Sequence, residues 1–114
     1  RISKASHPPQ KKFEKAESYI QEAVKIYREI FASDHIAIGN ALHDLGEIQR
    51  ENGNFRDAAR YFDRAYALYE KQTEAPASFG RLYKNKGTLF VRKGYYERAM
   101  TSFEYGDHIY REVY

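Results

Sequence analysis

His43 and Glu47 are the two side chains in this sequence whose types and spacing come closest to a chemical site. They stand four residues apart, so an α-helix places an imidazole and a carboxylate on one face, where both can bind one metal ion. A metal site needs a third protein ligand, and none stands at a suitable spacing beside the pair. We therefore expect no metal and interpret the two residues as a solvated polar pair on a helix surface.

Nucleophilic catalysis finds no support in the residue pattern. A serine nucleophile needs an activating base and an orienting third group, and no serine here has a glycine-flanked turn around it. The run Asn52-Gly53-Asn54 is typical of a turn, because a phosphate-binding loop would continue to Gly-Lys-Ser/Thr. The chain contains no cysteine, which excludes thiolate chemistry and disulfides. We expect a protein that is not an enzyme and that uses no cofactor.

A repeated apolar stripe determines the helices that position these side chains. In residues 54–72, large and small side chains alternate at steps of three and four, which predicts a helix that another helix approaches closely. The stripe consists of Phe55, Ala58, Phe62, Ala65 and Tyr69. It recurs 42 residues earlier at Phe13, Ala16, Ile20, Ala23 and Tyr27, and 41 residues later at Tyr96, Ala99, Phe103, Gly106 and Tyr110. A period in this range predicts an array of helical repeats.

The pattern predicts an all-α fold of about five antiparallel helices joined by short turns. The expected helices are 10–31, 36–52, 54–71, 77–93 and 95–113. Ser33 or Asp34 is expected to cap the second helix, and Gly53 to end it. The inward faces of the helices between the stripes are predicted at Ile38, Leu42, Leu45, Ile48 and Gln49, and at Phe79, Tyr83, Leu89 and Phe90. We divide the chain into a flexible lead-in, 1–10, and one domain, 11–114, made of a half repeat, 11–32, and two repeats, 33–73 and 74–114.

The charge distribution argues against nucleic acid as a partner. The net charge is +3, but Arg1, Lys4, Lys11 and Lys12 supply four positive charges before any acid, which leaves −1 for the rest. A near-neutral body lacks the basic face that phosphate binding needs. No apolar run approaches the roughly 18 residues of a membrane span, and the N-terminus has no apolar signal core. We expect no membrane association and a cytoplasmic location.

The helices resemble the tetratricopeptide repeat family in their motifs. The run Leu42-x-x-Leu45-Gly46, followed by small and aromatic stripe residues, matches the family pattern, and Tyr83-x-x-x-Gly87-x-x-Phe90 matches it again. The period of 41–42 residues exceeds the standard of about 34 and resembles the longer repeats of kinesin light chains and related bacterial proteins. Lys86 stands where the pattern has a leucine. The resemblance implies an antiparallel helix-hairpin solenoid wound as a right-handed superhelix.

The resemblance also implies a concave groove that holds an extended peptide along the first helix of each repeat. Asn85 matches the family asparagine that bonds the backbone of a bound peptide, since an amide both donates and accepts. One wall of the groove is expected to be acidic and the facing wall basic. The family positions fall here on Asn40, His43, Asp44, Glu47 and Arg50, and on Arg81, Lys84, Asn85, Thr88 and Arg92.

Tyrosine is concentrated at the C-terminal end, where five of the eleven tyrosines fall in the last twenty residues. A terminal solenoid helix normally has a polar outer face. Tyr105, Tyr110 and Tyr114 are therefore candidates for stacking or self-association.

Three functional hypotheses follow from this sequence. The first is a scaffold or adaptor that binds a protein or peptide partner in the groove without catalysis. The second is the regulatory sensor domain of a bacterial peptide-signalling receptor, which this repeat class resembles. The third is a structural unit that assembles end to end as a homo-oligomer through its terminal helices.

Overall fold

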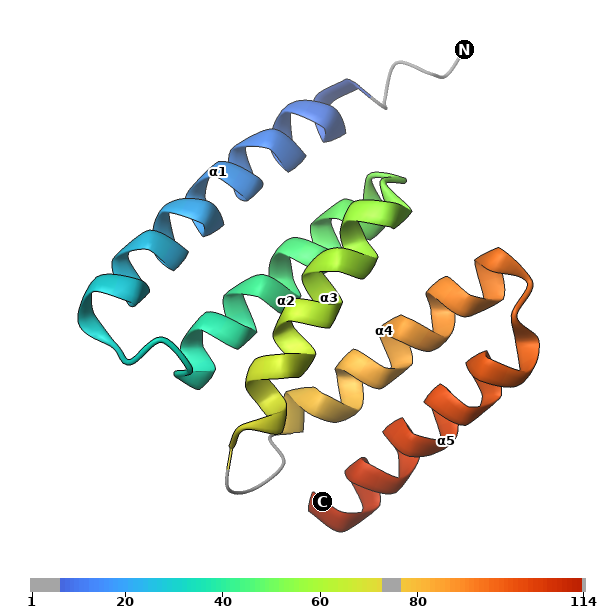
Figure 1. Cartoon of the computed structure of the whole chain (residues 1–114). Helices are drawn as coiled ribbons and strands as arrows, with labels where there is room; N and C mark the ends of the chain where they lie inside the picture. Colours follow the sequence, from blue (N-terminus) through green and yellow to red (C-terminus); the bar gives the residue numbers. More distant parts are fainter. Residues whose placement is uncertain (1–6, 73–76, 114) are drawn as a thin grey trace.

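The computed structural model of this protein describes residues 7–72 and 77–113, with the side chains of residues 11–72, 77–109, 111 and 112. All regular structure in these residues is helical (Figure 1). The five helices are α1 (His7–Ile30), α2 (Ile36–Glu51), α3 (Phe55–Glu70), α4 (Ala77–Lys93) and α5 (Tyr96–Val113). The predicted all-α fold with five helices is confirmed. The predicted repeat boundary at 73–74, like Tyr114, lies outside the described residues.

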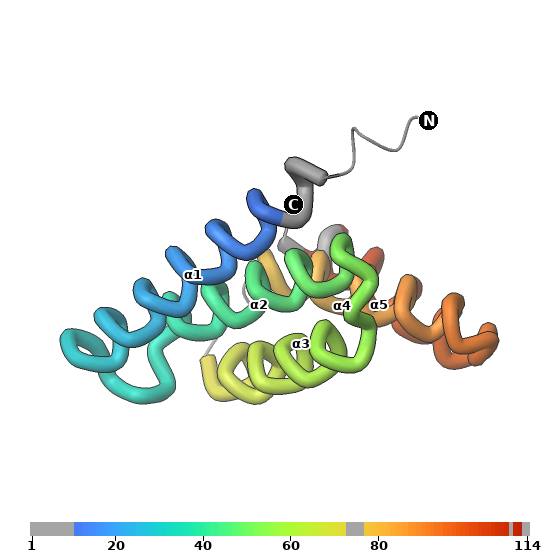
Figure 2. Tube along the Cα trace, turned by 90° about the horizontal axis from the view of Figure 1, so that it is seen from above, coloured from blue at the N-terminus to red at the C-terminus, as the bar shows by residue number. Residues whose placement is uncertain are grey.

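Each helix packs against the next one along the chain, and α2 also contacts α4. Figure 2 shows α3 against one side of α2, and Figure 1 shows α4 and α5 as a second hairpin beside it. The principal extents are 48 × 40 × 24 Å, so the thinnest dimension is about two helix diameters. Packing between neighbours in a flat array is the architecture of a helical solenoid.

The helix boundaries agree with the predicted ones within one residue except at the start of α1. That helix begins at His7 instead of Gln10, with Pro8 and Pro9 in its first turn. Proline is tolerated there because the first backbone N–H groups of a helix have no partner within the helix. Residues 7–10, which were predicted to belong to the flexible lead-in, are therefore part of α1.

The cap of α2 is His35 and not Ser33 or Asp34. The His35 backbone is extended, and its Nδ1 accepts a hydrogen bond from the Ala37 N–H at 3.0 Å. Its ring stacks on Phe31 with 4.0 Å between the ring centres, which holds the imidazole in place. At the other end of α2, Gly53 has φ +85° and turns the chain into α3, as predicted.

The middle copy of the stripe forms the centre of the core. Ala58, Phe62, Ala65 and Tyr69 are at most 1% exposed. The corresponding residues of α1 are only partly buried. On α5, Ala99 is buried, but Tyr96, predicted to lie in the stripe, is 66% exposed. The stripe is therefore buried most completely on α3, which has a helix on both sides, and less completely on α1 and α5, which each pack against one helix.

The inward faces predicted for α2 and α4 differ in how completely they are buried. On α2 every predicted residue is buried except Ile48, which is partly buried. On α4 Leu89 is buried, whereas Phe79, Tyr83 and Phe90 are partly buried. Leu82 is 0% exposed and was not among the predicted residues.

Gly46 brings α2 directly against the ring of Phe62. A Cβ added at Gly46 would lie 2.5 Å from Cδ1 and Cε1 of that ring. Helix propensity favours alanine over glycine by about 1 kcal/mol, but overpacking a full core costs about 1–3 kcal/mol. We expect Gly46→Ala to lower the free energy of unfolding by up to about 2 kcal/mol, measured by urea denaturation.

The matched control combines Gly46→Ala with Phe62→Leu, which removes the ring edge from the contact. The alanine should then cost less than it does beside the intact ring, because two contacting residues are not additive. Equal costs in both backgrounds would contradict the close approach as the reason for this glycine.

Candidate functional site

Polar side chains from α2 and α4 converge where these two helices meet. Arg81 of α4 lies between two acids of α2, with its Nε 3.3 Å from Glu47 Oε2 and its Nη2 3.5 Å from Asp44 Oδ1. Nearer the start of both helices, Ser78 Oγ donates a hydrogen bond to Asn40 Oδ1 at 3.1 Å. We call this surface the α2–α4 face and define it by Asn40, Asp44, Glu47, Arg50, Arg81 and Asn85.

His43 was expected to line the groove, but it is 0% exposed. Its ring meets the rings of Phe62 and Tyr69 edge-on, with centroid separations of 5.5 and 6.2 Å. The interpretation of His43 and Glu47 as a solvated pair is therefore wrong for the histidine. In sequence alone this position is polar, and only the packing of α3 and α4 on α2 encloses it.

The hydrogen bonds around His43 assign its tautomer. Asn85 Nδ2 lies 2.9 Å from Glu47 Oε2, and a carboxylate only accepts, so the amide nitrogen must face this cluster. The same nitrogen lies 2.9 Å from His43 Nε2, which therefore accepts its second N–H. The 2.9 Å bond to Nε2 then leaves the histidine proton on Nδ1. Nδ1 lies 3.4 Å from the Tyr69 hydroxyl, which can accept this proton, and 3.4 Å from Arg81 Nη2, a donor that forms no hydrogen bond with this tautomer.

The Tyr69 hydroxyl connects the hydrogen bonds around His43 to Asn40, at the N-terminal end of α2. The Tyr69 hydroxyl donates to Asn40 Oδ1 at 2.7 Å, the same oxygen that accepts from Ser78. Tyr69 and Ser78 were not predicted as site residues. The tyrosine was assigned to the core stripe, and the sequence shows no sign that the end of its ring reaches a polar group.

Asn85 is mostly committed to the fold and is not a free amide. Both N–H groups are used within the cluster, and the residue is 7% exposed. Among the described residues, no hydrogen bond ends on its Oδ1. The group expected to bond a peptide backbone in both directions is thus available there as an acceptor only.

The acidic and basic walls predicted for the groove pair with each other. Arg81 spans them, and the side chains of Arg81 and Asp44 are each about half exposed, at 47% and 51%. Partial burial raises the pKa of Asp44, and the Arg81 guanidinium opposes that rise. The α2–α4 face therefore presents a neutralised, organised polar surface.

The other predicted groove residues of α4 point elsewhere. Lys84 Nζ pairs with Asp107 of α5 at 3.0 Å. Arg92 lies over the ring of Phe55 of α3, with 4.1 Å from its guanidinium carbon to the ring centre. Thr88 donates to the Lys84 carbonyl within its own helix. The structure does not bring these three residues into the α2–α4 face cluster.

Arg50 carries an unsatisfied hydrogen-bond donor. Its Nε is buried without a hydrogen-bond partner among the described residues, although its Nη2 lies 3.8 Å from Glu51 Oε2. A buried donor left unpaired costs about 1–3 kcal/mol. Such a group indicates a position where a water molecule or a ligand oxygen completes the site.

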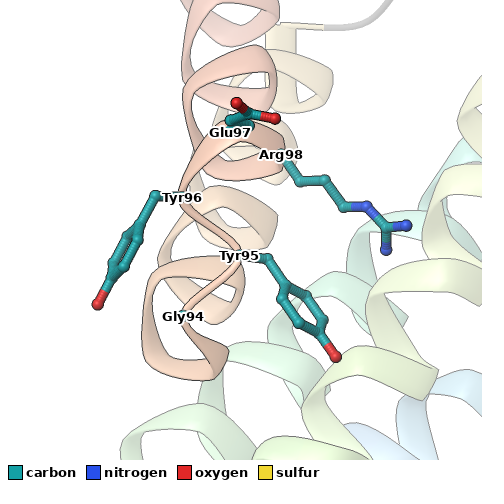
Figure 3. A pocket seen from close by; sticks show the side chains of 5 residues that line it. All are labelled: Gly94, Tyr95, Tyr96, Glu97 and Arg98. Carbon is teal, nitrogen blue, oxygen red and sulfur yellow. The ribbon is translucent and has the colours of Figure 1, made fainter.

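Other kinds of site have weaker geometric support. In the described part of the chain, no group of three His, Cys, Asp or Glu residues is arranged to hold a metal ion. None of the described helices is long and apolar enough to cross a membrane. The hollow at the α4–α5 turn has a volume of about 520 Å³, but Tyr95 and Arg98 point to one side of the turn and Tyr96 to the other (Figure 3). These side chains do not enclose a ligand.

Of the three tyrosines predicted to stack, only Tyr105 has a described side chain. It is 54% exposed and stacks on Tyr83 of α4, with ring centres 5.4 Å apart. The side chain of Tyr110 and the whole of Tyr114 lie outside the described residues.

Comparison with protein families places most of the N-terminal half of the chain in a known repeat family. A sequence model of the family described as Tetratricopeptide repeat matches residues 9–71. These residues include nearly all of α1, the whole of α2 and α3, and the α2 half of the α2–α4 face. No curated protein matches the chain.

Proposed function

Because the chain belongs to the tetratricopeptide repeat family, whose repeats generally mediate protein–protein interactions and are typically non-catalytic, we propose that it binds an extended segment of a partner protein along the α2–α4 face. We also propose that the chain belongs to the long-repeat variant of the family, because its stripe recurs at spacings of 41 and 42 residues. The proposed binding assigns the chain the role of a scaffold or adaptor.

The observation that carries the proposal is the unpaired Nε of Arg50. An extended peptide offers a carbonyl oxygen at every residue, which can accept from the guanidinium of Arg50, whose side chain is 25% exposed. Asn85 Oδ1 supplies the complementary acceptor for a peptide N–H. One donor and one acceptor on neighbouring helices suit a main chain of any sequence.

The ion pairs of the face support binding by holding it in shape. Arg81 is fixed by Glu47 and Asp44, and Asn85 by Glu47 and His43. Side chains already held in place lose little rotamer freedom when a ligand arrives, and this lowers the cost of binding. An isolated exposed ion pair would contribute little to folding stability.

Arg50→Ala tests the proposal, with Arg56→Ala of α3 as the control for loss of one positive charge from an exposed arginine. Peptides selected from a random-sequence library against the unmodified domain serve as the probe, and their Kd is measured by calorimetry. We expect Arg50→Ala to weaken binding by about tenfold or more, since hydrogen bonds to charged groups contribute about 1.5–3 kcal/mol. Arg56→Ala should leave the Kd unchanged.

Amide chemical-shift mapping completes the test. Shifts concentrated on α2 and α4, with normal melting of the Arg50→Ala domain, are the expected result. Selected peptides that bind both variants equally, or that shift residues away from α2 and α4, would refute the assignment of the groove.

A second candidate function is end-to-end self-association, favoured by exposed apolar side chains on α5. Tyr96 and Met100 are 66% and 62% exposed. The positions 41 residues earlier, Phe55 and Ala59, are partly buried beside α4. A second copy that covers α5 would bury the two exposed side chains in the same way.

A further inference from the structure

A small apolar pocket opens between α3 and α4, away from the α2–α4 face. We call it the junction pocket. Its volume is about 170 Å³, and its apolar lining is Ala59 and Phe62 of α3 with Leu89 and Phe90 of α4. A cavity of about 150 Å³ lined by apolar side chains holds a benzene ring. The junction pocket therefore has room for one apolar side chain.

The repeat itself explains why the hollow at this junction is apolar. The α1–α2 junction is its equivalent, 42 residues earlier on α1 and 41 earlier on α2. The equivalent junction also has a hollow, of about 160 Å³, but polar side chains, Glu17 and Gln49 among them, line it. There the counterparts of Ala59 and Phe90 are Glu17 and Gln49, and Gln49 Nε2 donates to Glu17 Oε2 at 2.9 Å. This hydrogen bond ties the two helices together. Alanine and phenylalanine at the same positions form no such bridge and leave an apolar gap.

Lys86 widens the difference between the two junctions. Its counterpart Leu45 is 2% exposed and belongs to the same buried cluster as Val24 of α1. Lys86 instead extends toward the surface, with its Nζ 4.8 Å from the Tyr66 ring centre and 3.4 Å from Asp63 Oδ1. A lysine stem covers apolar surface while its charge stays near water. Lysine here therefore places a positive charge beside the junction pocket, where the equivalent junction has a buried leucine.

The rim of the pocket carries a net positive charge. Lys86, Lys93 and Asp63 line it, and the pairing of Lys86 with Asp63 leaves one charge over. Lys93 is exposed and forms no ion pair with any described residue. A carboxylate beside the mouth would complement Lys93 electrostatically.

We propose that the junction pocket binds a partner protein segment through one aromatic or branched apolar side chain flanked by a carboxylate. A single buried anchor that fills a pocket typically dominates the energy of such contacts. The junction pocket shares no residue with the α2–α4 face, so the proposal goes beyond the proposed function. One partner can bind at both surfaces, or two partners can each bind at one.

Three short peptides serve as probes: acetyl-Glu-Phe-Glu-amide, acetyl-Glu-Ala-Glu-amide and acetyl-Lys-Phe-Lys-amide. Each is titrated into the isotope-labelled domain while amide chemical shifts are recorded. We expect the acidic phenylalanine peptide to shift Ala59, Phe62, Leu89 and Phe90 with a Kd of about 1 mM, a usual range for a single anchor. The other two peptides should bind at least about tenfold more weakly.

The double variant Ala59→Glu, Phe90→Gln installs the bridge of the α1–α2 junction and should abolish these shifts. Lys93→Glu changes only an exposed charge, so it keeps the test valid if the double variant does not fold. It should weaken the acidic peptide by about tenfold and strengthen the lysine-flanked one. Arg81→Ala, on the α2–α4 face, should change neither affinity.

Two outcomes would overturn the proposal. One is the absence of localised shifts with the acidic phenylalanine peptide at concentrations about ten times the expected Kd. The other is equal binding of the alanine and phenylalanine peptides, which would show that charge acts without an anchor. A failure of Arg50→Ala to affect library peptides leaves these readouts unchanged, so the two proposals fail independently.

Discussion

Phe62→Ala is expected to lower the free energy of unfolding by about 3–5 kcal/mol, the usual cost of removing a buried aromatic ring. Phe62 is 0% exposed and fits against Gly46 of α2, with the His43 ring edge-on to it. Because the glycine leaves no side chain to move into the space, the cavity cannot collapse. A small domain has only about 5–15 kcal/mol of stability, so urea or thermal unfolding should resolve this loss clearly.

Phe103→Ala is the matched control, because Phe103 is the equivalent of Phe62 in the next repeat. It meets Gly87 as Phe62 meets Gly46, but it is only partly buried. Since the loss scales with the area removed from water, the control should cost clearly less. Equal losses that depend on protein concentration would indicate that a second copy covers α5.

Much of the fold could be predicted from the sequence because one apolar period specifies it three times. The stripe on α3 requires two neighbouring helices, and its copies require the same arrangement on both sides. The degree of burial could not be read from the stripe. Phe55 and Tyr96 hold the same repeat position, yet only Phe55 is covered, by Arg92 of the following helix.

The start of α1 and the cap of α2 were missed for local reasons. Pro8 and Pro9 indicate a helix boundary in sequence, but proline is compatible with either side of a helix start. At α2 two residues of common cap type precede the histidine that caps it. His35 is held at the cap position by stacking on Phe31. This contact depends on where α1 ends, which local sequence does not specify.

The candidate site was predicted in part, because helix period places residues on a face without fixing their contacts. Asp44, Glu47, Arg81 and Asn85 do converge. His43 lies on the same face in sequence but is enclosed when α4 packs on α2, and this is a contact between residues about forty positions apart. The long side chains of Lys84 and Arg92 find partners on other helices.

The burial of His43 gives the protein a stability that depends on pH. Desolvation lowers the pKa of His43 from 6.5 to about 4, and the Arg81 charge adds to this effect. Glu47 opposes the shift, and Arg50 contributes in the same direction as Arg81. The folded protein therefore keeps this imidazole neutral under conditions in which the unfolded chain protonates it.

The sign of the effect follows from proton binding in the two states. Between pH 6.5 and about 4 the unfolded state binds more protons at His43 than the folded state does, so stability rises with pH in that interval. The stabilisation is complete above pH 6.5 and is lost as the pH falls toward 4. We expect a loss of about 2 kcal/mol between about pH 8 and pH 5, and of about 3 kcal/mol near pH 4.

His43→Gln separates this effect from every other titrating group, because it keeps a polar side chain that does not titrate. Urea unfolding of both proteins at several pH values gives the comparison, and their difference in unfolding free energy should shrink by about 2 kcal/mol from pH 8 to pH 5. The measurement stays above about pH 5 because the raised pKa of Asp44 contributes the opposite slope at lower pH. A difference that stays constant over this interval would mean that His43 accepts a proton in the folded protein, and the buried neutral tautomer assigned from Asn85 and Glu47 would then be wrong.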